Sequence, residues 1–289
     1  MKESSLNRHP EWLRVKDFDR SGYQKTLEII EKNCLNTVCL SANCPNRYEC
    51  FSKGTATFMI LGNICTRNCR YCNIKQGVPE PVDKKEPQRI GETIKKMNLS
   101  HAVITCVTRD DLDDGGAEQF VQVALEIKKK KSDCKIELLI SDLKGDFGSL
   151  EKILKARPEL INHNIEVAKD LFPKLRPQGD YNLSLELLRK VKDLDPEIIT
   201  KSGFMIGLGE DQDQVARTLK DLSGVGCDVV TVGQYLRPGQ ENVPVEKYYT
   251  PREFKEIQNL GLELGIKKVI SSPLTRSSYK AHDVLGKNK

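Results

Sequence analysis

The sequence has no apolar run that approaches the ~20 consecutive residues of a membrane-spanning helix. Its first residues, MKESSLNRHPEWLRVKDF, also have no apolar segment of the kind that directs secretion. It has no internal repeat and no long low-complexity linker. We therefore expect a protein of the cytoplasm that does not contact a membrane, and its 289 residues are enough to bury a sizeable core.

The absence of a secretion signal changes the meaning of the ten cysteines. In a secreted chain they would suggest disulfides, whereas in a reducing compartment metal-bound cysteines are the better account. Seven of them fall between positions 34 and 72. An odd number so close together is awkward for disulfides and natural for two iron–sulfur clusters.

Three cysteines on one predicted loop form the most specific motif. The segment TFMILGNICTRNCRYCNIKQ, residues 57–76, runs from an apolar strand through a Gly-Asn turn to Cys65, Cys69 and Cys72. Three thiolates spaced CxxxCxxC can hold three irons of a 4Fe–4S cube, which normally takes four cysteines. The fourth iron would then stay open to a substrate or cofactor. The alternative is a structural zinc site, but zinc ligands usually come in pairs such as CxxC…CxxC.

A second group of cysteines precedes this loop in CLNTVCLSANCPNRYECF. Cys34, Cys39 and Cys44 have the spacing Cx4Cx4C, whereas Cys39, Cys44 and Cys50 have Cx4Cx5C. Spacing alone leaves both ligand sets open, as well as a set of all four. Residues 1–33 before this group read as a peripheral extension that Trp12, the only tryptophan, anchors on the body.

Apolar patterns alternate between strands and helices through the rest of the chain. Strands are predicted at residues 58–61, 101–107, 135–140, 159–162, 198–206 and 228–232, with a last one at 268–271. Helices are predicted at residues 86–98, 116–131, 149–156, 183–194 and 211–225, and Thr250-Pro251 opens another. Strands that are each followed by a helix imply parallel βαβ units. We predict an α/β fold in which right-handed crossovers curl the sheet into a barrel or part of one.

Polar groups at the predicted strand ends are candidates for chemistry, because sites in such folds gather there. Asn162, Asn164 and Glu166 could bind ribose hydroxyls. Gly207 and Gly209 could admit a nucleotide, with a plain turn as the alternative. The other candidates are a cation site or solvated loop at Asp110, Asp111, Asp113 and Asp114, a base, ligand or hydrogen-bonded histidine at His163, and anion contacts at Lys201 and Arg237.

The net charge of +5 is concentrated at the end of the chain. Residues 266–289 contain six Lys or Arg and one Asp, which is 6 − 1 = +5. No nucleic-acid-binding motif accompanies this excess. A solvated tail is the simplest interpretation, and a basic surface for an acidic protein partner also fits.

The CxxxCxxC loop, with Tyr71 before its last cysteine, resembles that of the radical S-adenosylmethionine (SAM) superfamily. The whole chain, from RHPEWLRV to RSSY, resembles the lipoyl synthase family. The motifs that carry this resemblance are Cx4Cx5C, GTATFMILG, CxxxCxxC, DDLDDGGA, NHN at residues 162–164, RPxxDYxxSL, KSGxMxGLGE, GQYLxP and RSSY at residues 276–279.

The resemblance implies two 4Fe–4S clusters and SAM as co-substrate. Cys65, Cys69 and Cys72 would hold the SAM-cleaving cluster, with Tyr71, Asn162, Asn164, Glu166, Gly207 and Gly209 as SAM-binding candidates. Cys39, Cys44 and Cys50 would hold an auxiliary cluster whose fourth ligand is Ser278, and Cys34 has no counterpart in the family pattern. The expected fold is a partial (β/α)6 TIM-type barrel of residues 55–265, whose mouth is covered by an N-terminal extension, 1–54, and a C-terminal one, 266–289.

The reaction implied is insertion of two sulfur atoms at carbons 6 and 8 of an octanoyl chain on a lysine. That lysine belongs to a lipoyl carrier domain, such as the glycine-cleavage H protein or an acyltransferase subunit of a 2-oxo-acid dehydrogenase. A low-potential flavodoxin or ferredoxin and an iron–sulfur carrier for cluster repair would be further partners, with no nucleic acid among them. The alternatives are another radical SAM sulfur-inserting enzyme and a non-enzymatic iron–sulfur electron carrier.

Overall fold

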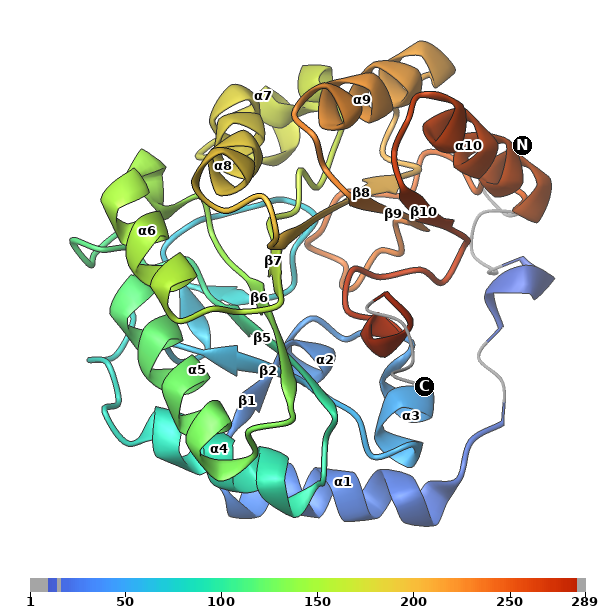
Figure 1. The fold of residues 1–289 in the computed structure, drawn as a ribbon. Helices are drawn as coiled ribbons and strands as arrows, with labels where there is room; N and C mark the ends of the chain where they lie inside the picture. Colours follow the sequence, from blue (N-terminus) through green and yellow to red (C-terminus); the bar gives the residue numbers. More distant parts are fainter. Residues whose placement is uncertain (1–9, 15–16, 285–289) are drawn as a thin grey trace.

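A mostly parallel sheet organises the chain, and the computed structural model describes residues 10–14 and 17–284 of it (Figure 1). Strand order is β1-β2-β5-β6-β7-β8-β9-β10, and every pairing is parallel except β1 with β2. The strands are β1 Asn36–Thr37, β2 Thr57–Ile60, β5 His101–Cys106, β6 Lys135–Leu139, β7 Leu160–Asn162, β8 Ile199–Ile206, β9 Val229–Gln234 and β10 Lys268–Ser271.

Six helices follow the first six parallel strands and lie around the outside of the sheet (Figure 1). They are α4 Glu86–Lys96, α5 Ala117–Lys130, α6 Phe147–Lys155, α8 Tyr181–Leu194, α9 Gln212–Gly224 and α10 Pro251–Glu263, with the short α7 Phe172–Leu175 before α8. The predicted capping box of α10 is present, since Thr250 accepts from the Glu253 amide and Glu253 from the Thr250 amide. The predicted partial barrel is confirmed, with β10 as a seventh parallel strand.

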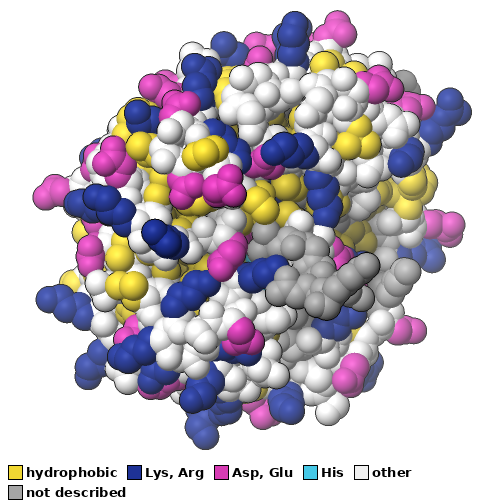
Figure 2. All heavy atoms as spheres, in the orientation of Figure 1, with side chains coloured by type: hydrophobic (Ala, Val, Ile, Leu, Met, Phe, Trp, Pro, Cys, Tyr) yellow, Lys and Arg dark blue, Asp and Glu magenta, His cyan; other side chains and the backbone are white. Residues whose placement is uncertain are grey.

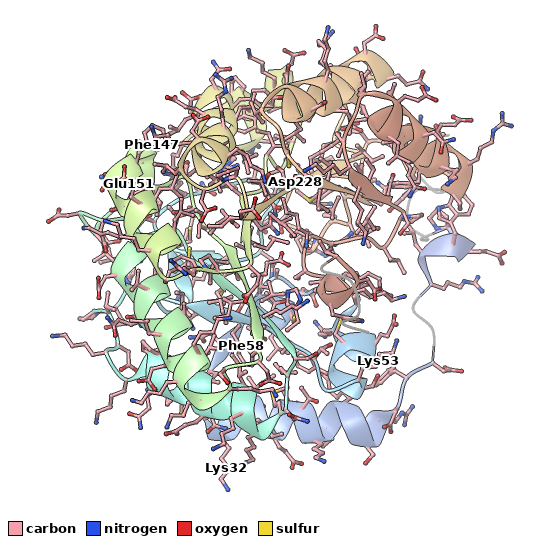
Figure 3. The ribbon with its side chains drawn as sticks, in the orientation of Figure 1. Lys32, Lys53, Phe58, Phe147, Glu151 and Asp228 are labelled. Carbon is pink, nitrogen blue, oxygen red and sulfur yellow. The ribbon has the colours of Figure 1, made fainter. Side chains whose placement is uncertain are left out.

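The outward face of the sheet and the helices bury two apolar clusters. The first joins β2, β5, β6 and β7 to α4, α5 and α6, and the second joins β8, β9 and β10 to α9 and α10. Figure 3 shows Phe58 of β2 inside the ring of helices and Lys32 directed away from it. No helix in the described part of the chain has the length and apolarity to span a membrane.

The barrel is open, because among the described residues no pairing joins β1 or β2 to β10. The N-terminal region contributes α1 Arg20–Lys32, α2 Val38–Ser41 and α3 Arg47–Ser52. The Asn46 side chain donates to the Leu274 carbonyl oxygen at 2.7 Å, so the two ends of the chain meet at the open side. Asn43 also donates to the Pro238 carbonyl oxygen after β9, so the N-terminal extension reaches the mouth.

The two extensions also reach beyond the mouth that they were expected to cover. Parts of both also line a cavity beside Thr57 and His101, which are the first residues of β2 and β5. The extensions therefore reach along the open side to the opposite end of the barrel. Trp12, which was predicted to anchor the N-terminal arm, is 41% exposed, and its neighbour Leu13 is buried.

The inward face of the sheet carries a buried ionic network. Glu137 of β6 accepts hydrogen bonds from Lys201 of β8 and Asn162 of β7, both at 2.9 Å, and His101 of β5 lies 3.4 Å from its other oxygen. The Glu137 side chain is fully buried and that of Lys201 is 1% exposed. Burial opposes ionisation of Glu137, but Lys201 and His101 outweigh it and lower its pKa.

We predict that Lys201→Met lowers the free energy of unfolding by about 3–5 kcal/mol, because it leaves a buried carboxylate without its counter-ion. Urea unfolding followed by circular dichroism measures the change. The control Lys129→Met, at an exposed surface pair, should cost less than about 1 kcal/mol. Adding Glu137→Leu to Lys201→Met should recover part of the loss, and a single variant as stable as the control would contradict the assignment.

Candidate active site: two cysteine triads

The first triad lies on the loop that leaves β2 at the carboxyl end of the barrel. Leu61 and Gly62 have φ of 68° and 90°, a left-handed turn that directs the chain across the strand ends. Short strands β3 Ile64–Cys65 and β4 Lys75–Gln76 then pair and close the loop. The amides of Arg67 and Ile74 donate to the sulfurs of Cys65 and Cys72, each at 3.4 Å.

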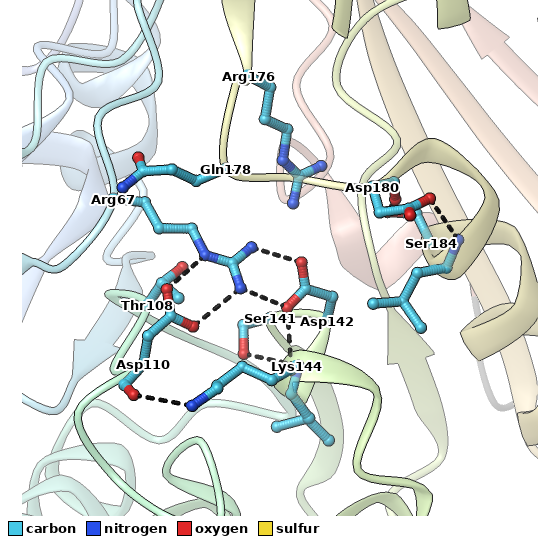
Figure 4. A network of polar contacts seen from close by, with 12 residues as sticks. Arg67, Thr108, Asp110, Ser141, Asp142, Lys144, Arg176, Gln178, Asp180 and Ser184 are labelled. Carbon is cyan, nitrogen blue, oxygen red and sulfur yellow. Dashed lines mark hydrogen bonds and ion pairs between the residues drawn. The ribbon is translucent and has the colours of Figure 1, made fainter. Parts of the chain in front are cut away.

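Arg67 anchors this loop to the barrel (Figure 4). Its Nε and Nη2 donate to both oxygens of Asp110, at 2.7 and 2.9 Å, and its guanidinium also donates to both oxygens of Asp142. Asp110 follows β5 and Asp142 follows β6, so one side chain joins three strand ends. Burial would raise the pKa of Asp142, but Arg67 outweighs it and lowers that pKa to about 2.

These contacts answer the question of a cation site in DDLDDGGA. Asp110 pairs with Arg67, and Asp111 pairs with Arg109 at 2.8 Å. Asp114 accepts from the amides of Gly116 and Glu118 and so starts α5. Three of the four acids therefore have structural partners, and the acidic motif holds the cysteine loop and the next helix.

A cavity of about 330 Å³ is lined by all three cysteines of the first triad. Asn242, from the loop after β9, donates to the Cys72 carbonyl oxygen at 2.8 Å and lines the same cavity. Burial raises the pKa of Cys72 to about 12, and that of Cys69 is raised by burial and lowered in part by Arg176. The thiols of Cys69 and Cys72 are therefore protonated at neutral pH, and metal loading must release those protons.

Two predicted cofactor residues, Glu166 and Asn164, lie beside this loop. The Asn164 side chain donates to Glu166 at 3.1 Å, and Glu166 has an unusual φ of 70°. Burial raises the pKa of Glu166, and Arg176 opposes this shift. The Glu166 carboxylate in turn raises the pKa of Cys69 and that of Cys72. Tyr71, also near Glu166, packs against the second apolar cluster. Glu166, Asn164 and Arg176 therefore lie beside the loop that carries the first triad.

The other predicted cofactor residues have internal partners. The Asn162 amide nitrogen bonds to Glu137, although its oxygen has no protein partner. Gly207, at φ 101°, leaves room for Gln234 and the Lys247 carbonyl, since a Cβ there would lie 2.1 Å from Gln234 Nε2. Gly209, at φ 107°, belongs to the same turn, in which Glu210 accepts from the Gly207 and Leu208 amides. SAM binding by Asn162, Gly207 and Gly209 stays a prediction.

The remaining candidates at the strand ends also have partners within the protein. Lys201 pairs with Glu137, and Arg237 donates to the carbonyl oxygens of Gln240 and Asn242. His163 is buried, and its Nδ1 lies 2.9 Å from the Ile140 carbonyl oxygen. Burial, followed by Arg176, lowers its pKa to about 4, so this histidine is neutral. Its Nε2 has no protein partner and can accept a hydrogen bond.

The second triad lies at the open side of the barrel. Cys39 on α2, Cys44 and Cys50 on α3 line a cavity of about 620 Å³ together with Arg276 and Ser278 of RSSY. Burial raises the pKa of Cys39 to about 11 and of Cys50 to about 12, and each is also raised by a neighbouring cysteine of the triad. Cys34 is exposed and does not line this cavity, so the Cx4Cx5C set is the one the fold brings together.

The donor sets fit iron–sulfur clusters. All ten cysteines are free thiols. No three Cys, His, Asp or Glu side chains within residues 10–14 and 17–284 are arranged around a single ion, as a zinc site would require. A 4Fe–4S cube instead gives each thiolate its own iron. Each triad lines one cavity with all three of its cysteines, and the second cavity is also lined by Ser278, which has a hydroxyl in place of a fourth thiol.

Arg67 and Arg176 were not among the site residues predicted from the sequence. Arg67 stands between Cys65 and Cys69, and Arg176 begins RPxxDYxxSL, so both lie within recognised motifs. The signal in the sequence was an arginine inside each of two motifs. Its meaning depended on partners far along the chain, such as Asp142 for Arg67 and the Asn164 carbonyl oxygen for Arg176.

The basic excess near the C-terminus does not form one patch among the described residues. Lys267 pairs with Asp228 at 2.7 Å, Lys268 donates to the Asp283 carbonyl oxygen, and Arg276 lines the second cavity. Lys280 is exposed, and Lys287 and Lys289 lie outside the described residues. Figure 2 likewise shows basic and acidic side chains interspersed over one face.

Comparisons with known proteins agree with this geometry. The profile of the Radical SAM superfamily matches residues 59–222, from β2 to α9. Solved structures with the same fold include a methylornithine synthase, with a TM-score of 0.56 at 17% identity over 76% of this chain and 72% of that one. An FeFe-hydrogenase maturase from Carboxydothermus hydrogenoformans gives 0.54 at 16% identity over 78% and 64%. The chain therefore belongs to the radical SAM superfamily.

Relatives similar over nearly the full length narrow this assignment. The lipoyl synthase of Alkaliphilus metalliredigens (strain QYMF) is 46% identical, covering 99% of this chain and 98% of its own. That of Caldanaerobacter subterraneus subsp. tengcongensis is 48% identical, covering 95% and 96%. Within the superfamily, the chain belongs to the lipoyl synthase family.

We predict that Asp142→Asn weakens the anchor of the cysteine loop and lowers the free energy of unfolding at pH 7 by about 2 kcal/mol. The native pKa of Asp142 is lowered to about 2 and its unfolded value is about 3.9. The stability from this ionised group is therefore present above pH ~4 and lost as the pH falls toward 2. Urea unfolding should show a wild-type advantage that is constant from pH 5 to 7 and shrinks below pH 4. An advantage that does not change with pH would contradict the assignment.

Proposed function

We propose that this protein is a lipoyl synthase: it inserts two sulfur atoms at carbons 6 and 8 of an octanoyl chain bound to a lysine of a carrier protein. The observation that carries the proposal is the second cavity, which is lined by Cys39, Cys44 and Cys50 and by Ser278 from the other end of the chain. A general radical SAM enzyme needs only the first triad. A second, serine-completed site suits an enzyme that must also supply sulfur.

Cys65, Cys69 and Cys72 would hold one 4Fe–4S cluster, and Cys39, Cys44, Cys50 and Ser278 the other. When bound, the first supplies the electron that cleaves SAM to a carbon radical, and the second supplies the sulfur. A radical is required because an unactivated C–H bond offers no acid or electrophile to a side chain. The protein's part is to bind and orient SAM and the octanoyl chain and to exclude water from them.

The residues beneath the first loop suit the polar groups of SAM. Arg176 is a buried cation near Cys69, and it can hold a carboxylate there. Glu166 and Asn164 can accept from and donate to ribose hydroxyls. The neutral His163, with an unpartnered Nε2, adds an acceptor. These roles are supported by position near the cysteine loop and by charge.

The division of the chain into parts follows from the two sites. We propose a radical SAM partial barrel at residues 55–265, an N-terminal extension at 1–54 that brings three auxiliary cysteines, and a C-terminal extension at 266–289 that brings Ser278. Two hydrogen bonds between the extensions, from Asn46 to the Leu274 carbonyl and from Tyr279 to Glu49, support this division.

The proposed partners follow from the reaction. The substrates are octanoylated lipoyl carrier domains, namely the H protein and the acyltransferase subunits of 2-oxo-acid dehydrogenases. A flavodoxin or ferredoxin would deliver low-potential electrons, and an iron–sulfur carrier would rebuild the sacrificed cluster. We propose that the reaction takes place in the cytoplasm without nucleic acid or membrane.

Anaerobic reconstitution tests the proposal directly. We expect roughly eight irons per chain, as two cubes. With SAM, dithionite and an octanoyl-lysine peptide, mass spectrometry should show 5′-deoxyadenosine and a peptide heavier by two sulfurs less two hydrogens. Omitting SAM is the control. About four irons would contradict the two-site assignment, and two cubes that yield no 5′-deoxyadenosine would favour a plain electron carrier.

A second prediction concerns Ser278. An alkoxide is a harder ligand than a thiolate, and we propose that it makes one iron easier to release. Ser278→Cys should therefore keep both clusters but form less than roughly a tenth of the sulfur-containing product. Quantitative mass spectrometry of the product, normalised to iron content, measures this. Full product yield with both clusters in place would contradict the idea.

A further inference from the structure

Hydrogen bonds to distant residues hold the chain on both sides of Ser278. Before it, the Asn164 side chain donates to Ser277 Oγ at 3.2 Å. After it, the Tyr279 hydroxyl donates to Glu49 Oε2 at 2.8 Å. Asn164 lies just after β7 and Glu49 on α3, so the RSSY segment is stretched between the mouth of the barrel and the helix that carries Cys50.

The backbone around Ser278 is a single turn. The Tyr279 amide donates to the Arg276 carbonyl oxygen at 3.0 Å, which puts Ser277 and Ser278 at the corner. The next residue, Lys280, has φ of 52°, so the chain changes direction immediately after Tyr279. Between β10 and the 3₁₀ helix Ala281–Asp283, this segment has no helix or strand of its own. Backbone hydrogen bonds tie Ser272 and Pro273 to β9 before the turn, and side-chain contacts then help to set where the turn itself lies.

The Tyr279–Glu49 contact is the shorter of the two side-chain contacts. Glu49 precedes Cys50, and Tyr279 follows Ser278, so the bond links the immediate neighbours of two residues that line the second cavity. Glu49 also pairs with Lys53 at 2.5 Å. An ionised acceptor makes the hydrogen bond from a neutral hydroxyl stronger.

We propose that Tyr279 and Glu49 are positioning residues that form a latch and hold the hydroxyl of Ser278 at the auxiliary site. The inference rests on the proposed function, because it takes Cys39, Cys44, Cys50 and Ser278 as cluster ligands. It adds two residues outside the ligand set. Their contact fixes the position of the C-terminal extension relative to the N-terminal extension. Without the latch, the turn keeps its own hydrogen bond but loses its fixed distance to Cys50.

The test measures iron retention and does not depend on turnover. Cys65, Cys69 and Cys72 are replaced by alanine in the full chain, so that all counted iron belongs to the auxiliary site. The rate of iron release to a ferrous chelator is then followed anaerobically. Tyr279→Phe removes the hydroxyl and keeps the ring, and we expect iron release to become roughly tenfold faster. Glu49→Ala should have the same effect, and the double variant should be no faster than either single variant.

Tyr48→Phe is the matched control. Tyr48 lies on the same helix, and its hydroxyl accepts from Arg47, so the substitution removes one hydroxyl without touching Tyr279. Iron release from this variant should stay within about twofold of the parent. Circular dichroism and thermal unfolding of each variant show whether the fold is intact.

Rescue distinguishes positioning from general stability. Combining Ser278→Cys with Tyr279→Phe should restore slow iron release, because a thiolate binds iron tightly enough without the latch. Unchanged release in Tyr279→Phe, or fast release that Ser278→Cys does not correct, would overturn the inference. Both results leave the proposed function standing. If the parent with only the auxiliary cysteines binds no iron at all, the proposed function itself fails.

Discussion

The site depends on the ion pairs that the buried guanidinium of Arg67 makes with Asp110 and Asp142. A charged group away from water is tolerated only when its donors are satisfied, and Arg67 satisfies them with the carboxylates of Asp110 and Asp142. Those carboxylates follow neighbouring parallel strands, so the cation can bridge them only if β5 and β6 end side by side. The ends of β5 and β6 thereby fix the orientation of the cysteine loop. A loop of this length without such an anchor would lose entropy each time it presented three sulfurs to one point.

The open side of the barrel is the second constraint. A partial barrel leaves two sheet edges, and this chain covers one with the short antiparallel β1 and fills the space between them with its extensions. The same arrangement brings Ser278 to a cavity shared with Cys39, Cys44 and Cys50. The extensions that fill the opening are thus also the segments that form the proposed auxiliary site. The inward face of the sheet, in contrast to its apolar outer face, carries the Glu137–Lys201 pair and unpartnered acceptors on Asn162 and His163.

Much of the fold was predictable, because strands buried between helices and helices with one apolar face leave strong local patterns. The strands from β5 to β10 and the capping box at Thr250 and Glu253 are found within a residue or two of their predicted bounds. The N-terminal helices α1, α2 and α3 were not predicted, since α2 and α3 are too short to show a period and the residues of α1 were assigned to a peripheral extension. The exposure of Trp12 and the pairing of the basic C-terminal residues could not be predicted for another reason: burial and pairing depend on which surface lies opposite, and a sequence does not display it.

By itself the sequence determined the chemistry available to this protein. The spacing of Cys65, Cys69 and Cys72, and of Cys39, Cys44 and Cys50, is local, and local spacing limits what one loop can bind. Only the tertiary structure decided what these groups work with: Arg67 with Asp110 and Asp142, Arg176 beside Glu166, and Tyr279 with Glu49 beside Ser278 and Cys50. These pairs are far apart in the chain, and the order of the parallel strands together with the open side of the barrel brings them within hydrogen-bonding or electrostatic range.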